Sequence, residues 1–194
     1  MAEQVQNSAG TRERLLAAAE QLLLTGRYDE VSVRGICAAA GANSAAVHYH
    51  FGSKEALVAA LIEDRLGALW DTRLTELVAR QAGVAEVVDA VIEPFVDLAA
   101  DPVGRLHLRL MAQFVLGRRP MGFSRPWFRL DTWDGMLPGL GERESRRRWM
   151  LAFDLIIMRF GNLEAPGSDL STGAVATLRD FVVAGLTAPT GENR

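Results

Sequence analysis

Apolar residues recur with a helical period along nearly the whole chain, and this spacing restricts the possible folds more than any other feature. In "TRERLLAAAEQLLLTG" one helical face carries most of the apolar side chains: Leu15, Leu16, Ala19, Leu22 and Leu23. Further helical stretches are predicted at residues 71–82, 84–101, 104–119, 124–138, 142–163 and 171–187. No alternating strand pattern competes with them, so the sequence predicts an all-α protein.

Residues 11–51 are predicted to form three short helices. Thr11 is expected to cap the first helix and Gly26 to end it. Ser32 is expected to cap the second helix, which ends at Gly41, and the third begins at residue 43 or 44. Two helices that meet across a short turn containing glycine form a helix-turn-helix arrangement.

A longer helix is predicted to follow, from a cap at Ser53 to about residue 73. Beyond it the helical stretches are longer. We therefore expect two domains joined through this long helix, a three-helix helix-turn-helix domain at residues 8–68 and a larger helical bundle at residues 69–194.

The stretch "AAVHYHFGSKEAL", residues 45–57, contains the third helix. Val47 and Phe51 lie one turn apart and are expected to point into the small core. The opposite face is then shared by four residues: Ser44, Ala45, His48 and Tyr49. Small residues at the start and polar rings at the end suit a recognition helix, whose first residues meet base edges in the major groove. The alternative is a solvated helix end.

Two predicted helix starts lie on either side of this helix in the sequence. Ser32 is followed by Arg34, and Ser53 by Lys54, so each start places backbone amides beside a cation. Such a helix start is suited to binding a phosphate. The alternative is that both serines act only as helix caps.

The overall composition limits the partners. The net charge is −3 and the pI about 5.7, so a nucleic acid would have to meet a local basic patch. A single cysteine, Cys37, excludes an internal disulfide, and no second ligand accompanies it for zinc. The start "MAEQVQNSAG" lacks a signal-peptide pattern, and no apolar run is long enough for a membrane span. We expect a cytoplasmic protein without metal or cofactor.

The segment from Thr11 to Glu63 closely resembles the N-terminal domain of the tetracycline-repressor-type (TetR) transcriptional regulators, above all in "GANSAAVHYHFGSKEAL". The resemblance implies a homodimer, usually a repressor, that binds double-stranded DNA and whose larger domain binds a small effector. It implies backbone or base contacts from these residues: Ser32, Arg34, Asn43, Ser44, Ala45, His48, Tyr49 and Lys54. Histidine stands at position 48 where tyrosine is frequent, and Ala45 and Ala46 offer only methyl contacts, so direct base readout is expected to be sparse.

The larger domain is expected to hold an apolar effector among aromatic and polar side chains of its helices. The predicted pocket residues are Trp70, Phe95, His107, Met111, Phe114, Trp127 and Trp133. The alternative is that these residues form an ordinary core.

The last two helical stretches carry broad apolar stripes. They predict a four-helix dimer interface formed by Trp149, Phe153, Ile157, Phe160, Leu178, Phe181 and Val182. The alternative is that both stripes pack only within one chain.

These patterns predict a ligand-responsive repressor that binds a palindromic operator as a dimer and is released by a small molecule. A helical enzyme or small-molecule-binding protein that retains a helix-turn-helix is the alternative, although no catalytic triad, metal cluster or phosphate-binding glycine loop is visible. An architectural protein that binds DNA without sequence preference is disfavoured by the acidic balance.

Overall fold

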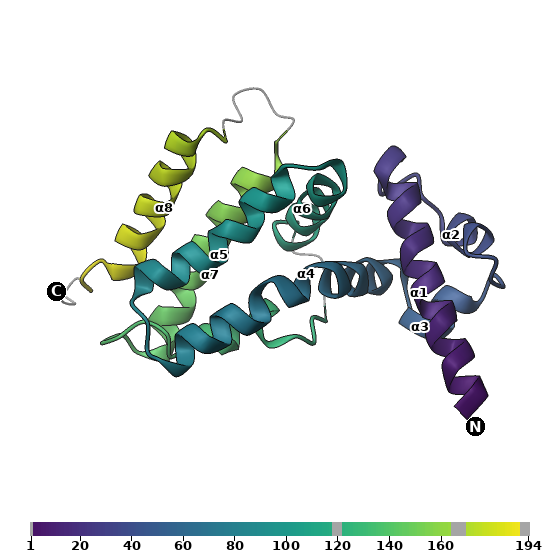
Figure 1. Ribbon diagram of the computed structural model, residues 1–194, viewed down its shortest axis with the longest axis horizontal. Coiled ribbons are helices and arrows are strands. Elements are labelled where there is room, and N and C mark those ends of the chain that lie inside the picture. Colours follow the sequence, from purple (N-terminus) through teal and green to yellow (C-terminus); the bar gives the residue numbers. More distant parts are fainter. Residues whose placement is uncertain (1, 118–121, 164–169, 191–194) are drawn as a thin grey trace. The chain divides into compact units, whose positions relative to one another are not determined.

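The computed structural model describes residues 2–117, 122–163 and 170–190, with the backbone alone for residues 2–8, and this described part confirms the all-α prediction (Figure 1). It contains no strand. Its α-helices are α1 (Ala2–Thr25), α2 (Val33–Ala39), α3 (Ala46–Phe51), α4 (Lys54–Ala79), α5 (Val84–Ala99), α6 (Pro102–Val115), α7 (Glu142–Gly161) and α8 (Thr172–Thr187). Two 3₁₀ turns, η1 (Pro126–Phe128) and η2 (Leu130–Trp133), precede α7.

The chain separates into two compact units, and the boundary between them falls inside α4, between Arg65 and Leu66. The N-terminal unit contains α1, α2, α3 and the first turns of α4. The C-terminal unit contains the rest of α4 and the helices that follow it. The division into domains at residues 8–68 and 69–194 stays a prediction.

The core of the N-terminal unit is built from the predicted apolar faces. Leu15 and Leu16 of α1, Val47 of α3 and Leu57 and Leu61 of α4 are completely buried. Burial of a leucine or valine side chain contributes about 1.5–3 kcal/mol to folding. These contacts hold the short helices α2 and α3, which are too short to be stable alone.

Helix α1 begins earlier than predicted. It starts at Ala2, so Thr11 lies inside the helix and the prediction that Thr11 caps it is wrong. The Thr11 hydroxyl instead accepts a hydrogen bond of 3.0 Å from Nη2 of Arg14, one turn further along. The end of the helix is as predicted, because α1 stops at Thr25 and Gly26 follows it.

Helix α4 is one continuous helix of 26 residues, where the sequence suggested two segments overlapping near residue 73. Gly67 lies within it without ending it. The side chain of Arg125 lies so close to Gly67 that any Cβ there would collide with it, and Arg125 Nη1 binds the Asp71 carboxylate at 2.5 Å. Gly67 therefore provides space for Arg125 inside an unbroken helix.

The C-terminal unit is a bundle in which α5 contacts α6, α7 and α8 (Figure 1). Asp101 caps α6 by accepting from the amides of Val103 and Gly104, and Pro102 follows it, where proline is favourable. Gly104 faces the Leu98 carbonyl so closely that a Cβ would overlap with it. This close approach sets the corner between α5 and α6.

The prediction of a helix at residues 124–138 is wrong. This segment forms η1 and η2, because the Pro126 carbonyl accepts from the Arg129 amide at 2.9 Å and from the Thr132 hydroxyl at 2.6 Å. These bonds close tighter turns than an α-helix does. Of the aromatic side chains in this segment, Trp133 is almost completely buried, whereas Trp127 and Phe128 are half-buried.

Candidate nucleic-acid interface

The turn between α2 and α3 is fixed by glycine and asparagine. Gly41 has φ +61°, its amide donates to the Ala38 carbonyl, and the Ala42 amide donates to the Cys37 carbonyl. This pair of bonds is a Schellman motif, which requires a left-handed residue and favours glycine. Asn43 Oδ1 then accepts from the Ala45 amide at 3.0 Å. The backbone is thereby directed into α3.

Helix α3 begins at Ala46, slightly later than the predicted residue 43 or 44. Asn43, Ser44 and Ala45 therefore lie in the preceding turn, and all three are exposed. Ala46 is only 8% exposed, so the expectation that its methyl group meets a base is wrong. Its side chain packs inward because α3 turns this position toward the core.

The outward face of α3 carries the predicted polar rings. Tyr49 is 82% exposed, far more than any other large apolar side chain among the described residues. His48 is exposed as well. Its Nδ1 lies 2.9 Å from the Gly52 carbonyl, and because a carbonyl only accepts, Nδ1 donates to it. The ring of His48 is therefore held in one orientation at the surface.

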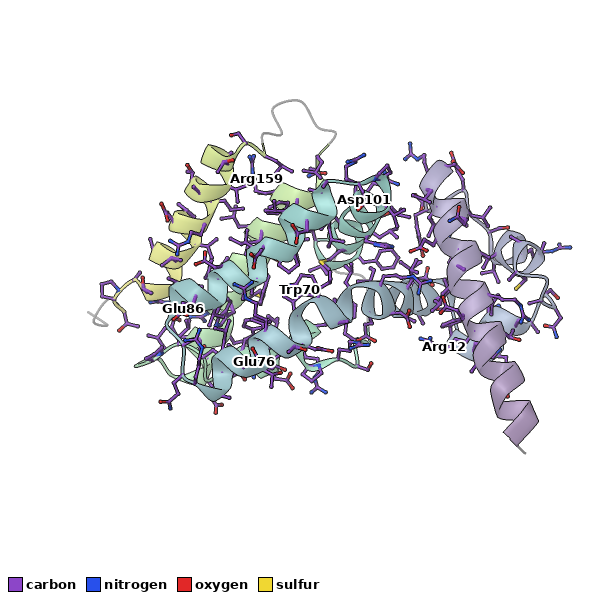
Figure 2. All side chains as sticks on the ribbon, in the orientation of Figure 1. Arg12, Trp70, Glu76, Glu86, Asp101 and Arg159 are labelled. Carbon is purple, nitrogen blue, oxygen red and sulfur yellow. The ribbon has the colours of Figure 1, made fainter. Side chains whose placement is uncertain are left out.

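His50 and Phe51 face a different way. His50 is half-buried, and its ring meets that of Tyr49 edge to face at a centroid distance of 5.0 Å. Phe51 is also half-buried and lies 5.5 Å from the guanidinium of Arg12, which extends from α1 (Figure 2). Gly52, with φ +83°, ends the helix and turns the chain toward α4.

Both predicted serine caps are present. Ser32 Oγ accepts from the Gly35 amide at 3.0 Å, and Ser53 Oγ accepts from the Ala56 amide at 3.0 Å. Arg34 is exposed in the first turn of α2. It has no carboxylate within 4.0 Å among the described residues. Arg34 therefore remains a candidate for a phosphate contact.

Lys54 is held by partners within its own unit. Its Nζ donates to the Tyr28 carbonyl at 2.5 Å and lies 3.9 Å from the centroid of the Tyr28 ring. The Tyr28 hydroxyl donates to Glu55 Oε1 at 2.9 Å. The pKa of the Glu55 carboxyl is lowered by a hydrogen bond from its own backbone amide and then by this hydroxyl. Lys54 thus ties α4 to the segment after α1, an arrangement that sequence spacing did not reveal.

The ion pairs of the N-terminal unit gather between α1 and α4. Arg65 binds three carboxylates, those of Glu13, Glu20 and Asp64, and Arg12 approaches Asp64 at 3.5 Å. These cations are neutralised by the protein itself. A DNA phosphate would have to compete with carboxylates for them, which makes them poor candidates for the interface.

In the C-terminal unit, the predicted pocket residues divide between two aromatic groups. Trp70 of α4 extends toward α5, where it packs on Phe95 at 5.5 Å and donates from Nε1 to the Val91 carbonyl at 3.1 Å (Figure 2). Trp127 and Trp133 form a second group, 5.5 Å apart. The other predicted members, His107, Met111 and Phe114, are buried on α6.

The second aromatic group includes two residues that had been assigned to a dimer interface. Trp149 lies 4.6 Å from Trp133, and Phe153 lies 4.8 Å from it, centroid to centroid. Trp149 is 1% exposed, and its Nε1 has no hydrogen-bond acceptor among the described residues. Periodicity placed both on an apolar stripe of α7 but did not show which neighbour the stripe meets.

Most of the predicted dimer residues are covered within the single chain. Those buried are Trp149, Ile157, Phe160, Leu178 and Val182. Phe153 is half-buried, and Phe181 is 69% exposed. Three other large apolar residues of α7 are exposed: Met150, Leu151 and Met158. Whether any of them meets a second chain remains a prediction.

Two properties of the described residues bear on other classes of protein. No cluster of three or more histidine, cysteine or acidic side chains there is arranged to bind a metal ion. None of the described helices combines the length and apolarity that a bilayer span needs.

Residues 15–61 match the family model described as bacterial regulatory proteins, tetR family. Two crystal structures of NalD, the secondary repressor of the MexAB-OprM multidrug efflux pump in Pseudomonas aeruginosa, are similar to the chain. Native NalD gives a TM-score of 0.59 at 20% identity, covering 92% of this chain and 97% of NalD. The second structure gives 0.56 at 18% identity, covering 95% and 100%. This similarity shows a shared fold, and no curated protein sequence matches the chain.

Proposed function

We propose that this chain, whose residues 15–61 match the family model of the bacterial tetR regulators, represses transcription as a homodimer that binds a palindromic operator and is released by a small molecule. The observation that carries the proposal is the outward face of α3, where Tyr49 and an oriented His48 follow a rigid turn. Ser44 and Ala45 reach base edges from that turn. His48, Tyr49, Ser32 and Arg34 contact the backbone on either side.

Lys54 remains a proposed phosphate contact. Its ammonium donates to the Tyr28 carbonyl, so a phosphate contact is made in addition to this bond and does not replace it. Asn43 shapes the turn through Oδ1 and presents its amide nitrogen to DNA.

Dimerisation in the proposal uses the exposed faces of α7 and α8. Met150, Leu151 and Met158 lie within one side of α7, and Phe181 projects from α8. Exposed apolar side chains grouped on one face favour an interface. Two such helices from each chain would form a four-helix bundle, so that one two-fold axis relates the protein halves and the operator halves.

The effector in this proposal binds among the aromatic side chains of the C-terminal unit. Trp149 supports this site, because buried N–H groups nearly always have an acceptor. A neutral aromatic molecule with one acceptor atom would supply it. Such a ligand releases DNA only if it binds the free and DNA-bound conformations with different affinity, and α4 belongs to both units.

The test is fluorescence anisotropy with labelled duplexes that tile the DNA upstream of the protein's own coding sequence. We expect one duplex to bind with a Kd in the range of about 10⁻⁸–10⁻¹¹ M, and the others about a thousandfold or more weakly. Equal affinity for all duplexes would contradict an operator-specific repressor. It would favour binding through the DNA backbone alone.

A further inference from the structure

A hollow of about 410 Å³ lies beside α3 within the N-terminal unit. Helix α1, the turn before α3 and α3 itself all contribute to its wall, which includes Thr11, Arg14, Asn43, Ala45, Tyr49 and His50. Asn43, Ala45 and Tyr49 are proposed DNA contacts, whereas Arg14 was assigned no role from the sequence. The hollow therefore places a cation of α1 next to the DNA-facing residues.

Arg14 is held in position by neutral groups. Its Nε donates to the Ala40 carbonyl at 3.3 Å, at the end of α2, and its Nη2 donates to the Thr11 hydroxyl at 3.0 Å. A guanidinium has five N–H donors, so these two bonds leave three for a ligand. The guanidinium is thus oriented, and most of its donors remain available at an exposed residue.

The charge of Arg14 is not neutralised by the described residues. No carboxylate among them lies within 4.0 Å of its guanidinium, whereas Arg12 and Arg65 of the same unit both pair with acids. No acidic residue lines the hollow either. Asn43, Tyr49 and His50 add groups that can donate hydrogen bonds. These features suit an anion.

We propose that a backbone phosphate of the bound DNA sits in this hollow and is held by the Arg14 guanidinium. This inference rests on the proposed binding of α3 to DNA, because the duplex that meets Ala45 and Tyr49 brings phosphates to the same wall. Arginine suits the task, since its planar fork matches the oxygens of a phosphate. Because Arg14 also donates to the end of α2, the contact links α1 to the helix-turn-helix.

The experiment compares the full chain with Arg14→Gln, Arg14→Lys and a control, Arg129→Gln, which removes one positive charge from an exposed site of the C-terminal unit. Affinity for the operator duplex and for an unrelated duplex is measured from 50 to 200 mM salt. Each phosphate contact contributes about −0.9 to the slope of log affinity against log salt. For each protomer, the advantage of wild type over Arg14→Gln should therefore fall three- to fourfold across this range on both duplexes.

We expect Arg14→Lys to keep most of the wild-type slope and Arg129→Gln to keep all of it. Ethylation interference gives a second readout. Ethylation of one phosphate per half-site should weaken binding of the wild type but not binding of Arg14→Gln. An unchanged slope and footprint in Arg14→Gln, even with weaker binding, would overturn the proposal and show that Arg14 only supports α2. Melting curves followed by circular dichroism confirm that each variant is folded.

Free phosphate is the other source of the same ligand chemistry. Titration with inorganic phosphate, followed by ³¹P linewidths, tests whether the hollow is an anion site unrelated to DNA. Binding that Arg14→Gln abolishes, together with an unchanged DNA slope, would overturn the proposal in favour of that site. Failure of the wild type to bind any duplex would instead contradict the proposed function.

Discussion

His48 reaches the surface with one ring nitrogen already in use. Since Nδ1 donates to the Gly52 carbonyl, the neutral ring offers only an acceptor at Nε2, and the charged ring offers a donor there. A DNA phosphate is an acceptor. A direct contact between Nε2 and a phosphate therefore requires the charged form of the ring.

DNA affinity should consequently rise as pH falls, because this contact takes up a proton on binding. Binding that takes up one proton per protomer strengthens by at most about tenfold per pH unit for each protomer. We expect His48→Gln to abolish this dependence and His50→Gln to keep it. Anisotropy titrations at fixed ionic strength provide the measurement. A pH effect that survives in His48→Gln would assign the proton to another group.

Replacement by phenylalanine should change the free energy of unfolding differently at Trp70 and at Trp149. Both rings are buried, but Trp70 Nε1 binds the Val91 carbonyl, whereas Trp149 Nε1 has no acceptor among the described residues. Trp70→Phe loses a hydrogen bond of about 1 kcal/mol, and Trp149→Phe removes an unsatisfied donor. Trp149→Phe should therefore lower the free energy of unfolding less than Trp70→Phe, by about 1 kcal/mol or more. Urea denaturation measures both, and equal losses would indicate that a water molecule accepts from Trp149.

Sequence patterns located the helices best where a cap and an apolar face agree. Ser32 and Ser53 each cap a helix that begins at the next residue, as predicted. The prediction fails where a different hydrogen-bond pattern decides. The helix expected at residues 124–138 gives way to tight turns closed by bonds at the Pro126 carbonyl.

In the candidate DNA interface as well, the sequence predicted local features but not contacts between distant residues. The exposed positions of Tyr49 and His48 followed from the helical period of α3. The fixing of Lys54 by Tyr28, 26 residues away, and the position of Arg14 against Ala40, also 26 residues away, did not. Such contacts depend on how α1 packs on its neighbours, which a local pattern does not record.

Two glycines inside helices should respond differently to alanine. A Cβ at Gly104 would overlap the backbone carbonyl of Leu98, which cannot move without shifting α5, so Gly104→Ala should cost about 1–3 kcal/mol or more. A Cβ at Gly67 would meet only the flexible side chain of Arg125, while alanine favours the helix by up to about 1 kcal/mol. Thermal unfolding should therefore show a large loss for Gly104→Ala and little change for Gly67→Ala. Similar losses in both would mean that Arg125 is as rigid as backbone.

An ion pair between α5 and α8 should make their packing depend on pH. Arg179 Nε and Nη2 bind both oxygens of Asp89 at 2.7 and 3.0 Å, and the hydrogen bond from Arg179 holds the pKa of Asp89 below its ordinary value near 4. A lowered carboxyl pKa stabilises the fold above pH 4 and loses this effect as pH falls below it. Asp89→Asn should lower the melting temperature at pH 7 by no more than about 3 °C, because the pair is partly exposed. The gap should narrow as pH falls below 4, and a gap that stays constant there would point to packing instead.

Apolar stripes on α7 and α8 cannot by themselves distinguish an intrachain core from a dimer interface, because both need apolar side chains. Burial separates the two. Trp149, Phe160 and Val182 are covered within one chain, whereas Leu151 is 63% and Phe181 69% exposed. On α7, the exposed face proposed for the dimer therefore points away from most of the residues that periodicity selected.

If two chains associate through this exposed face, a charge placed there should separate them without unfolding either chain. Phe181→Glu and Leu151→Glu each put a carboxylate where the proposed four-helix bundle is dry, and an unpaired buried charge is strongly unfavourable. Val103→Glu is the control, because Val103 is an exposed apolar residue of α6 outside this face. Sedimentation velocity should give dimers for wild type and Val103→Glu, and monomers for the other two at micromolar concentration. Since one recognition helix then contacts one half-site alone, the separated chains should keep their melting curves and lose most of their affinity for the full operator. A Phe181→Glu chain that remains dimeric would exclude this face as the interface.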